Sequence, residues 1–179
     1  MGIYAQDLKE SVIHPTLTQL NQWTPAIEAL LLGTASIMSN LGDCLSVDSM
    51  ATNNQQRLFG LYLISKKKHR DIWDNHLAYN SDLASVIRGL ASQRLFLENP
   101  ENELVTNLSY ATAIAWATYD ENLVEFPDDP CNLLELATCW FEHYPHSLPA
   151  TQKDKYVTRF VTGLRTIIQS PRNKPQLVA

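Results

Sequence analysis

The chain has 179 residues, 45% hydrophobic and 18% charged, which is typical of one globular domain and too apolar for a disordered segment. Its formal net charge of −5 excludes the broad basic surface of most nucleic-acid-binding domains. The three cysteines, Cys44, Cys131 and Cys139, show no paired spacing, so a disulfide framework is excluded and a reducing compartment is favoured.

Helical periodicity runs through the chain and alternating β-branched runs are nearly absent, so an all-α fold is expected. A first helix is expected over residues 5–21, kinked or split at Pro15. A second is expected over 24–42, with Thr24 as its N-cap and Gly42 as its stop. Apolar side chains cover much of its circumference, so it is predicted to be the most buried helix.

Residues 43–57 are polar and irregular and predict a long loop. Further helices are expected to start at capping residues such as Ser81, Asp129 and Thr151. Their predicted ranges are 66–79, 81–94, 102–120, 131–143 and 152–168. Residues 1–168 therefore predict a single helical domain, and the proline-punctuated residues 169–179 predict an extended C-terminal tail outside its core.

Several segments resemble a phage-encoded family related to lytic transglycosylases and goose-type lysozymes. In the 24–42 helix, the family stretch Gly-Thr-Ala-Ala-Gln-Glu-Ser-x-Leu-Gly is matched at Gly33, Thr34, Ala35, Ser39, Leu41 and Gly42. The segments 58–64, 69–79, 107–115 and 137–144 are similar to further family segments, so the resemblance spans roughly residues 10–145. It implies a compact lysozyme-like helical domain with a glycan groove.

The chain departs from the family at two positions that would touch substrate. Met38 stands where the family has its general acid, a glutamate, and Leu63 stands where the family has a substrate-contacting glutamine. Glycoside cleavage needs a proton donor with a raised pKa, which a thioether cannot supply. The resemblance then implies a vestigial groove made of Met38, Ser39, Gly60, Tyr62, Leu63, His69, Trp73, Asn107, Tyr110 and Tyr144.

Two carboxylates near Met38 in sequence are candidate replacement acids. Glu28 lies ten residues earlier on the same helix, about 15 Å away, which is too far. Asp43 lies just beyond the helix end and is the candidate acid if the chain is active. Trp73 is the tryptophan best suited to a sugar groove, whereas Trp116 is expected in the core.

The sequence provides little support for a metal or cofactor site. Cys139 and His143 are four residues apart on one predicted helix and His146 follows, but zinc needs further ligands and no second cluster appears. We therefore expect no metal and no cofactor. The basic run 66–70 is read as a solvated helix start rather than a phosphate or lipid site.

Two functions from different classes follow. The first is a non-catalytic phage virion structural or accessory protein, made in the host cytoplasm, that contacts other virion proteins or copies of itself through residues 43–57 or 166–179. The alternative is an active peptidoglycan-cleaving muramidase or lytic transglycosylase with a displaced acid, for which peptidoglycan is the partner. Neither implies nucleic acid, and no apolar run is long enough to imply a membrane. A third reading is an unrelated α-helical protein.

Overall fold

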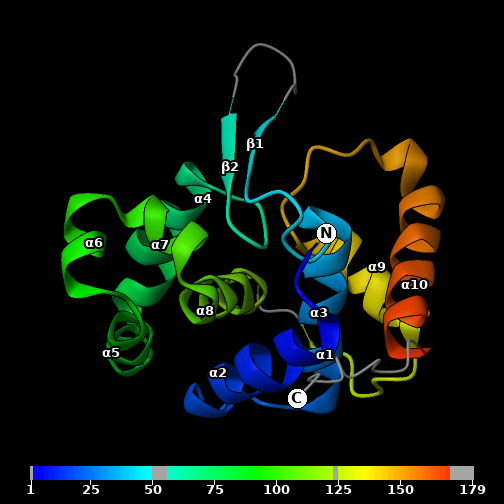
Figure 1. The fold of residues 1–179 in the computed structure, drawn as a ribbon, viewed down its shortest axis with the longest axis horizontal. Helices are drawn as coiled ribbons and strands as arrows, with labels where there is room; N and C mark the ends of the chain where they lie inside the picture. Colours follow the sequence, from blue (N-terminus) through cyan, green and yellow to red (C-terminus); the bar gives the residue numbers. More distant parts are fainter. Residues whose placement is uncertain (1, 50–55, 123–124, 170–179) are drawn as a thin grey trace, which may run out of the picture.

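The structure is a computed structural model that describes residues 2–49, 56–122 and 125–169. Helices make up most of it, which confirms the prediction of a mainly helical domain (Figure 1). The all-α expectation is wrong in one region, because residues predicted to form a long loop contribute to a small three-stranded sheet.

The sheet follows the first central helix and is antiparallel in the order β1-β2-β3. Its strands are β1 (Ser46–Ser49), β2 (Gln56–Phe59) and β3 (Ile64–Ser65). The register places Val47 opposite Leu58 and Asp48 opposite Arg57, so an apolar pair and a pair of opposite charges face each other across the strands. The part of the predicted loop formed by residues 50–55 lies outside the described residues.

Between β2 and β3 the chain turns through two left-handed residues, Gly60 (φ 74°) and Leu63 (φ 48°). A Cβ atom at Gly60 would lie 2.6 Å from the carbonyl carbon of Leu104, so the turn requires glycine there. Leu63 adopts this conformation despite its side chain, at a cost of about 1–2 kcal/mol.

The N-terminal helix is continuous but irregular. It consists of α1 (Ala5–Leu8), the π-helical turn η1 (Lys9–Ile13) and α2 (His14–Gln19). The wide turn lies directly before Pro15, which has no N–H to donate, so the predicted interruption takes the form of a π turn. It packs against the two central helices, α3 (Pro25–Ser39) and α8 (Leu108–Asp120).

The first central helix, α3 (Pro25–Ser39), starts as predicted, with Thr24 Oγ1 accepting a hydrogen bond from the Ile27 amide at 3.1 Å. It ends earlier than predicted, because Asn40 (φ 52°) and Leu41 (φ 58°) already adopt the left-handed conformation before Gly42. Asn40, not Gly42, is therefore the C-cap.

The middle of the chain is broken into more helices than the sequence predicts. The predicted helices 66–79, 81–94 and 102–120 correspond to α4 (Lys66–Asp71), η2 (Ile72–His76), η3 (Leu77–Tyr79), α5 (Ser81–Leu90), α6 (Gln93–Glu98), α7 (Pro100–Thr106) and α8 (Leu108–Asp120). The break before α8 has a clear cause, because Asn107 has an extended backbone and its Oδ1 accepts from the Tyr110 amide at 3.0 Å.

The C-terminal part contains α9 (Leu133–His143), the short η4 (Ala150–Gln152) and α10 (Lys153–Gln169). Asn132 caps α9, while the predicted cap Asp129 closes the preceding turn by accepting from the Cys131 amide at 2.8 Å. The helix α10 extends through Gln169, and residues 170–179 of the predicted tail lie outside the described residues.

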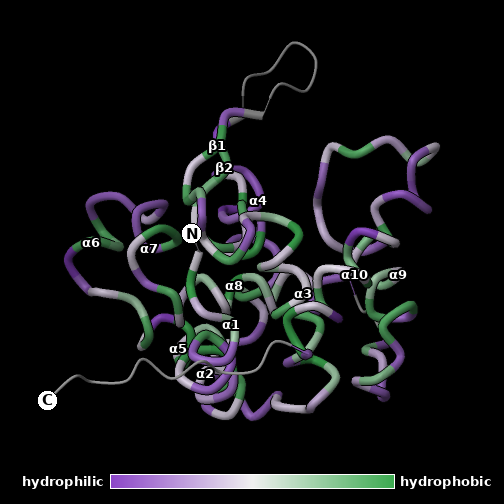
Figure 2. The backbone as a smooth tube through the Cα atoms, turned by 45° about the vertical axis from the view of Figure 1, so that its right-hand side comes forward, coloured by the Kyte–Doolittle hydropathy of each residue, from purple (hydrophilic) through white to green (hydrophobic). Residues whose placement is uncertain are grey.

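The core lies between α3 and α8. The N-terminal helix packs across both, α9 and α10 cover α3, and α5 and α7 cover α8 (Figures 1 and 2). Residues 110–119 of α8 are all buried, Trp116 among them as predicted. The prediction that α3 is the most buried helix is therefore wrong, since α8 has the longer unbroken buried run.

One contact in this core joins α3 to α8 directly. Thr34 Oγ1 and the Tyr119 hydroxyl lie 2.7 Å apart in a fully buried hydrogen bond.

Within residues 2–49, 56–122 and 125–169, no helix is both long and apolar enough to span a bilayer.

Candidate functional site

A cavity of about 530 Å³ opens between the C-terminal end of α3, the small sheet, and the α9–α10 region. This volume is typical of a small-molecule site. Its lining residues are Ile37, Met38, Val47, Asp48, Leu58, Leu63, Ser65, Trp140, Pro145, His146, Ser147, Leu148, Tyr156 and Arg159.

Met38 and Leu63 both line this cavity although they lie far apart in the sequence. They are the positions at which the family resemblance places an acid and a glutamine. Met38 is half-buried at the last turn of α3, and Leu63 is buried in its left-handed conformation. Strained backbone of this kind concentrates at functional sites, and here it holds a side chain against the cavity.

Asp48 is the carboxylate among the lining residues, and sequence reasoning missed it. It is exposed on β1, in a segment that was predicted to be a loop. Asp43, the predicted replacement acid, is not among the lining residues, and its Oδ2 accepts from Asn40 Nδ2 at 3.4 Å.

Glu28 lies near the opposite end of α3, as expected, and is buried in a set of donors. Its carboxylate accepts from Trp23 Nε1 at 2.7 Å, and its oxygens lie 2.9 Å from His14 Nδ1 and 3.1 Å from Lys9 Nζ. These contacts compensate for the burial of the charge and fix α3 against the N-terminal helix. Glu28 is thus a structural residue.

The predicted groove residues nearest the cavity are buried supports of its wall. Ser39 Oγ donates to the Leu61 carbonyl at 2.6 Å and accepts from the Gly42 amide at 2.9 Å, which joins the end of α3 to the turn after β2. The Tyr144 hydroxyl donates to the Tyr62 carbonyl at 2.9 Å. Burial raises the pKa of both tyrosine hydroxyls, so both stay neutral.

The other predicted groove residues form a separate cluster between η2 and α8. Trp73 Nε1 donates to the Tyr110 hydroxyl oxygen at 2.9 Å, and His69 Nε2 lies 2.6 Å from the same oxygen. Burial lowers the pKa of His69 to about 4, so the ring is neutral. The His69 tautomer decides whether the ring or the Tyr110 hydroxyl donates this hydrogen bond.

Asn107 joins this cluster through its cap on α8, and its Nδ2 also donates to the Leu90 carbonyl at 2.8 Å. Of the ten residues predicted to form the groove, Met38 and Leu63 are therefore the two that line the cavity. The remaining eight positions are not among its lining residues. Trp73 is half-buried with its indole N–H bonded inside the protein.

The Cys139–His143–His146 spacing does not form a ligand set. His146 Nε2 donates to the Phe141 carbonyl at 2.8 Å, and its Nδ1 accepts from the Leu148 amide at 3.3 Å, so backbone groups occupy both ring nitrogens. Burial raises the pKa of the Cys139 thiol to about 11. No group of three or more potential ligands is positioned to hold a metal ion among the described residues.

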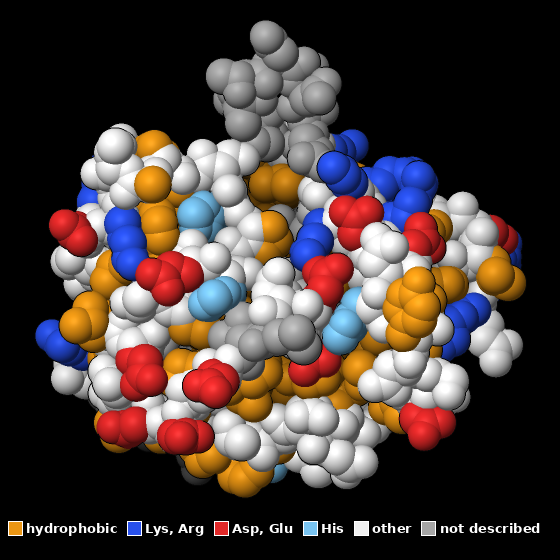
Figure 3. Space-filling view, turned by 180° about the vertical axis from the view of Figure 1, so that it is seen from behind, with side chains coloured by type: hydrophobic (Ala, Val, Ile, Leu, Met, Phe, Trp, Pro, Cys, Tyr) orange, Lys and Arg blue, Asp and Glu red, His pale blue; other side chains and the backbone are white. Residues whose placement is uncertain are grey.

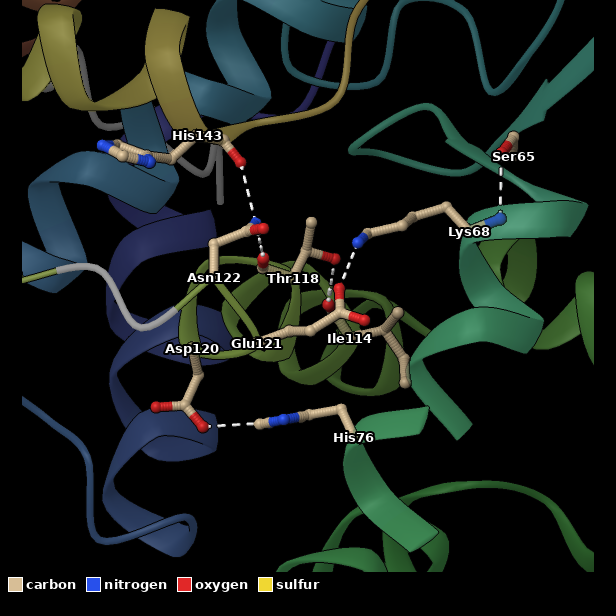
Figure 4. A network of polar contacts seen from close by, with 9 residues as sticks. All are labelled: Ser65, Lys68, His76, Ile114, Thr118, Asp120, Glu121, Asn122 and His143. Carbon is tan, nitrogen blue, oxygen red and sulfur yellow. Dashed lines mark hydrogen bonds and ion pairs between the residues drawn. The ribbon is translucent and has the colours of Figure 1, made fainter. Parts of the chain in front are cut away.

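The basic run at the start of α4 is partly neutralised by acidic residues. Lys66 pairs with Glu101 at 3.0 Å, and Lys68 pairs with Glu121 at the end of α8 (Figure 4). In the same network His76 Nε2 lies 3.0 Å from an Asp120 oxygen. Figure 3 shows basic and acidic side chains interspersed on one face of the molecule.

The chain matches no family model, no curated protein and no solved structure.

Proposed function

We propose that the chain is a non-catalytic phage virion structural or accessory protein on a degenerate lysozyme-like scaffold, acting through protein contacts. The observation that carries this proposal is the meeting of Met38 and Leu63 in one cavity. The family resemblance assigns both positions to a glycan groove from sequence alone.

The side chains at those positions support the loss of chemistry. Neither a thioether nor an isobutyl group can donate a proton, and an isobutyl group cannot hydrogen-bond a sugar hydroxyl. Asp48 is exposed on β1, opposite Arg57, and lacks the apolar enclosure that makes a carboxyl group a general acid at neutral pH. Under this proposal the cavity stands where the resemblance expects a glycan groove, and it lacks the reactive groups of such a groove.

A second groove supports a role in protein contacts. It lies between the start of α9 and the end of α10 and includes Leu134 and Ile168, whose side chains are 63% and 59% exposed. Exposed apolar side chains gathered in a groove are typical of protein interaction sites. The groove ends at Gln169, directly before the predicted tail.

Mass spectrometry of purified particles from the phage that encodes the chain tests this proposal. We expect a constant copy number relative to the major capsid protein after high-salt washing. Leu134→Glu should lower that copy number, because it places a charge in the groove, whereas Leu97→Glu on α6, also at an exposed leucine but outside the groove, should not. A protein found in the lysate supernatant and absent from washed particles would contradict the proposal.

The alternative, an active muramidase with a displaced acid, now depends on Asp48 rather than Asp43. The observation in its favour is that Asp48 lines the same cavity as Met38. Cell-wall hydrolysis by the unmodified protein that is abolished by Asp48→Asn, and not by Asp43→Asn, would support it.

A further inference from the structure

We propose that the cavity beside Met38 binds a small amphipathic carboxylate, with its apolar body on the α3 side and its carboxylate against α10. This inference rests on the proposed function in one respect, namely that the cavity no longer serves glycan chemistry. It adds a ligand class that the loss of catalysis does not by itself provide.

The apolar part of the wall selects an apolar ligand body. Met38, Leu63, Leu58 and Val47 contribute side chains that lack a hydrogen-bond donor. His146 adds no free ring nitrogen, since both are bonded to backbone groups. An alkyl or aromatic body placed against this part of the wall would gain free energy from leaving water, although the cavity lining also includes polar residues, Ser65 and Ser147 among them.

The α10 wall supplies donors for an anionic group. Tyr156 and Arg159 both line the cavity and are three residues apart, so they share one side of the helix. Arg159 is exposed and Tyr156 is half-buried, and in the described part of the chain neither the guanidinium nor the hydroxyl makes a hydrogen bond or ion pair with another side chain. A guanidinium and a hydroxyl together can serve both oxygens of a carboxylate.

Nearby charges orient the ligand. Lys155 Nζ lies 5.7 Å from the centre of the Tyr156 ring and adds positive charge near the same end of the cavity. Asp48 lines the cavity from β1 and repels an anion there. The favourable position of a carboxylate is therefore at Arg159, with the apolar body extending toward Met38.

Calorimetric titration of the full chain with sodium decanoate, below its micelle-forming concentration, tests the proposal. We expect one decanoate per chain, and at least about tenfold weaker binding of decanol, which has the same chain without the charge. Decylammonium, which carries the opposite charge, should bind more weakly than decanoate.

Two variants locate the ligand. Arg159→Gln should raise the Kd for decanoate about tenfold and leave decanol unaffected, whereas Arg70→Gln, a matched change at an exposed arginine of α4 outside the cavity, should change neither. Met38→Glu should abolish decanoate binding, because it places a carboxylate against the ligand body. Circular dichroism confirms that each variant is folded.

The outcomes separate this proposal from the proposed function. Equal affinity for decanol and decanoate, stronger binding of decylammonium, or an unchanged Kd in folded Arg159→Gln would overturn the assignment of a carboxylate ligand. None of these results bears on whether the protein enters particles or cleaves glycans. Conversely, a protein that binds decanoate as expected but is absent from washed particles would retain this site and lose the proposed function.

Discussion

Close packing of α3 against α10 depends on Gly33, and Gly33→Ala should destabilise the protein. A Cβ atom there would lie 2.6 Å from Cε1 and 2.9 Å from Cε2 of Phe160, both far inside van der Waals contact. The ring has little room to move, since it is buried and stacks on Trp140 at 5.5 Å between centroids. The helices would have to separate.

The size of the effect follows from two opposing terms. Overpacking a core costs about 3 kcal/mol at the upper end of the usual range, which suits a clash with a confined ring. Replacing glycine by alanine within a helix contributes about 1 kcal/mol in the other direction. We therefore expect a net loss of about 2 kcal/mol, which lowers the urea midpoint by about 1 M if m is about 2 kcal/mol/M.

Urea unfolding followed by far-UV circular dichroism measures this effect, with Gly89→Ala as the matched control. Gly89 is exposed in α5, and a Cβ atom there would meet nothing within 4 Å. That substitution should raise stability by about 0.5–1 kcal/mol through helix propensity. If Gly33→Ala behaved like Gly89→Ala, or if adding Phe160→Ala did not relieve its effect, the packing described for α3 and α10 would be wrong.

Two further predictions concern the cluster around Tyr110. The pKa of His69 is about 4 in the folded protein and 6.5 in its ordinary state, so the unfolded chain takes up a proton that the folded one excludes. The contribution of His69 to the free energy of unfolding should be fully present above pH 6.5 and should be lost, by roughly 3 kcal/mol, as the pH drops to 4. His69→Gln should remove most of this pH dependence when urea unfolding is repeated across that range. Asn107→Ala should lower the free energy of unfolding by about 1–2 kcal/mol in thermal unfolding, because it removes the α8 cap and the hydrogen bond to the Leu90 carbonyl. The control Ser92→Ala removes the cap of the short exposed α6 and should cost less. Equal effects would contradict the role assigned to Asn107.

The sequence predicts the main helices because their caps and apolar periodicity are local signals. Thr24 and the apolar circumference of α3 are of this kind, and so is the position of the interruption at Pro15. The strands β1 and β2 are short and polar, and their pairing depends on contacts such as Val47 with Leu58 that local patterns do not encode.

The candidate site could be predicted only in part. Met38 and Leu63 follow from the family resemblance, but Asp48 and Arg159 come to the cavity from a strand and a helix far apart in sequence, and no pattern relates them. Polar residues such as His69 and Tyr110 were assigned to the groove because a resemblance does not distinguish a residue that contacts a ligand from one buried beneath it. Their burial makes the distinction, since His69 is 3% exposed and Tyr110 is 0% exposed.

The most direct test of the central claim is the release of soluble fragments from purified peptidoglycan by the unmodified protein, measured beside an active muramidase. We predict no release, because under the proposed function the thioether of Met38 stands where an active enzyme would need its acid. Met38→Glu combined with Leu63→Gln should yield weak release, provided that the variant remains folded. Clear release by the unmodified protein, lost on Asp48→Asn or Asp43→Asn, would contradict the claim that the chain is non-catalytic.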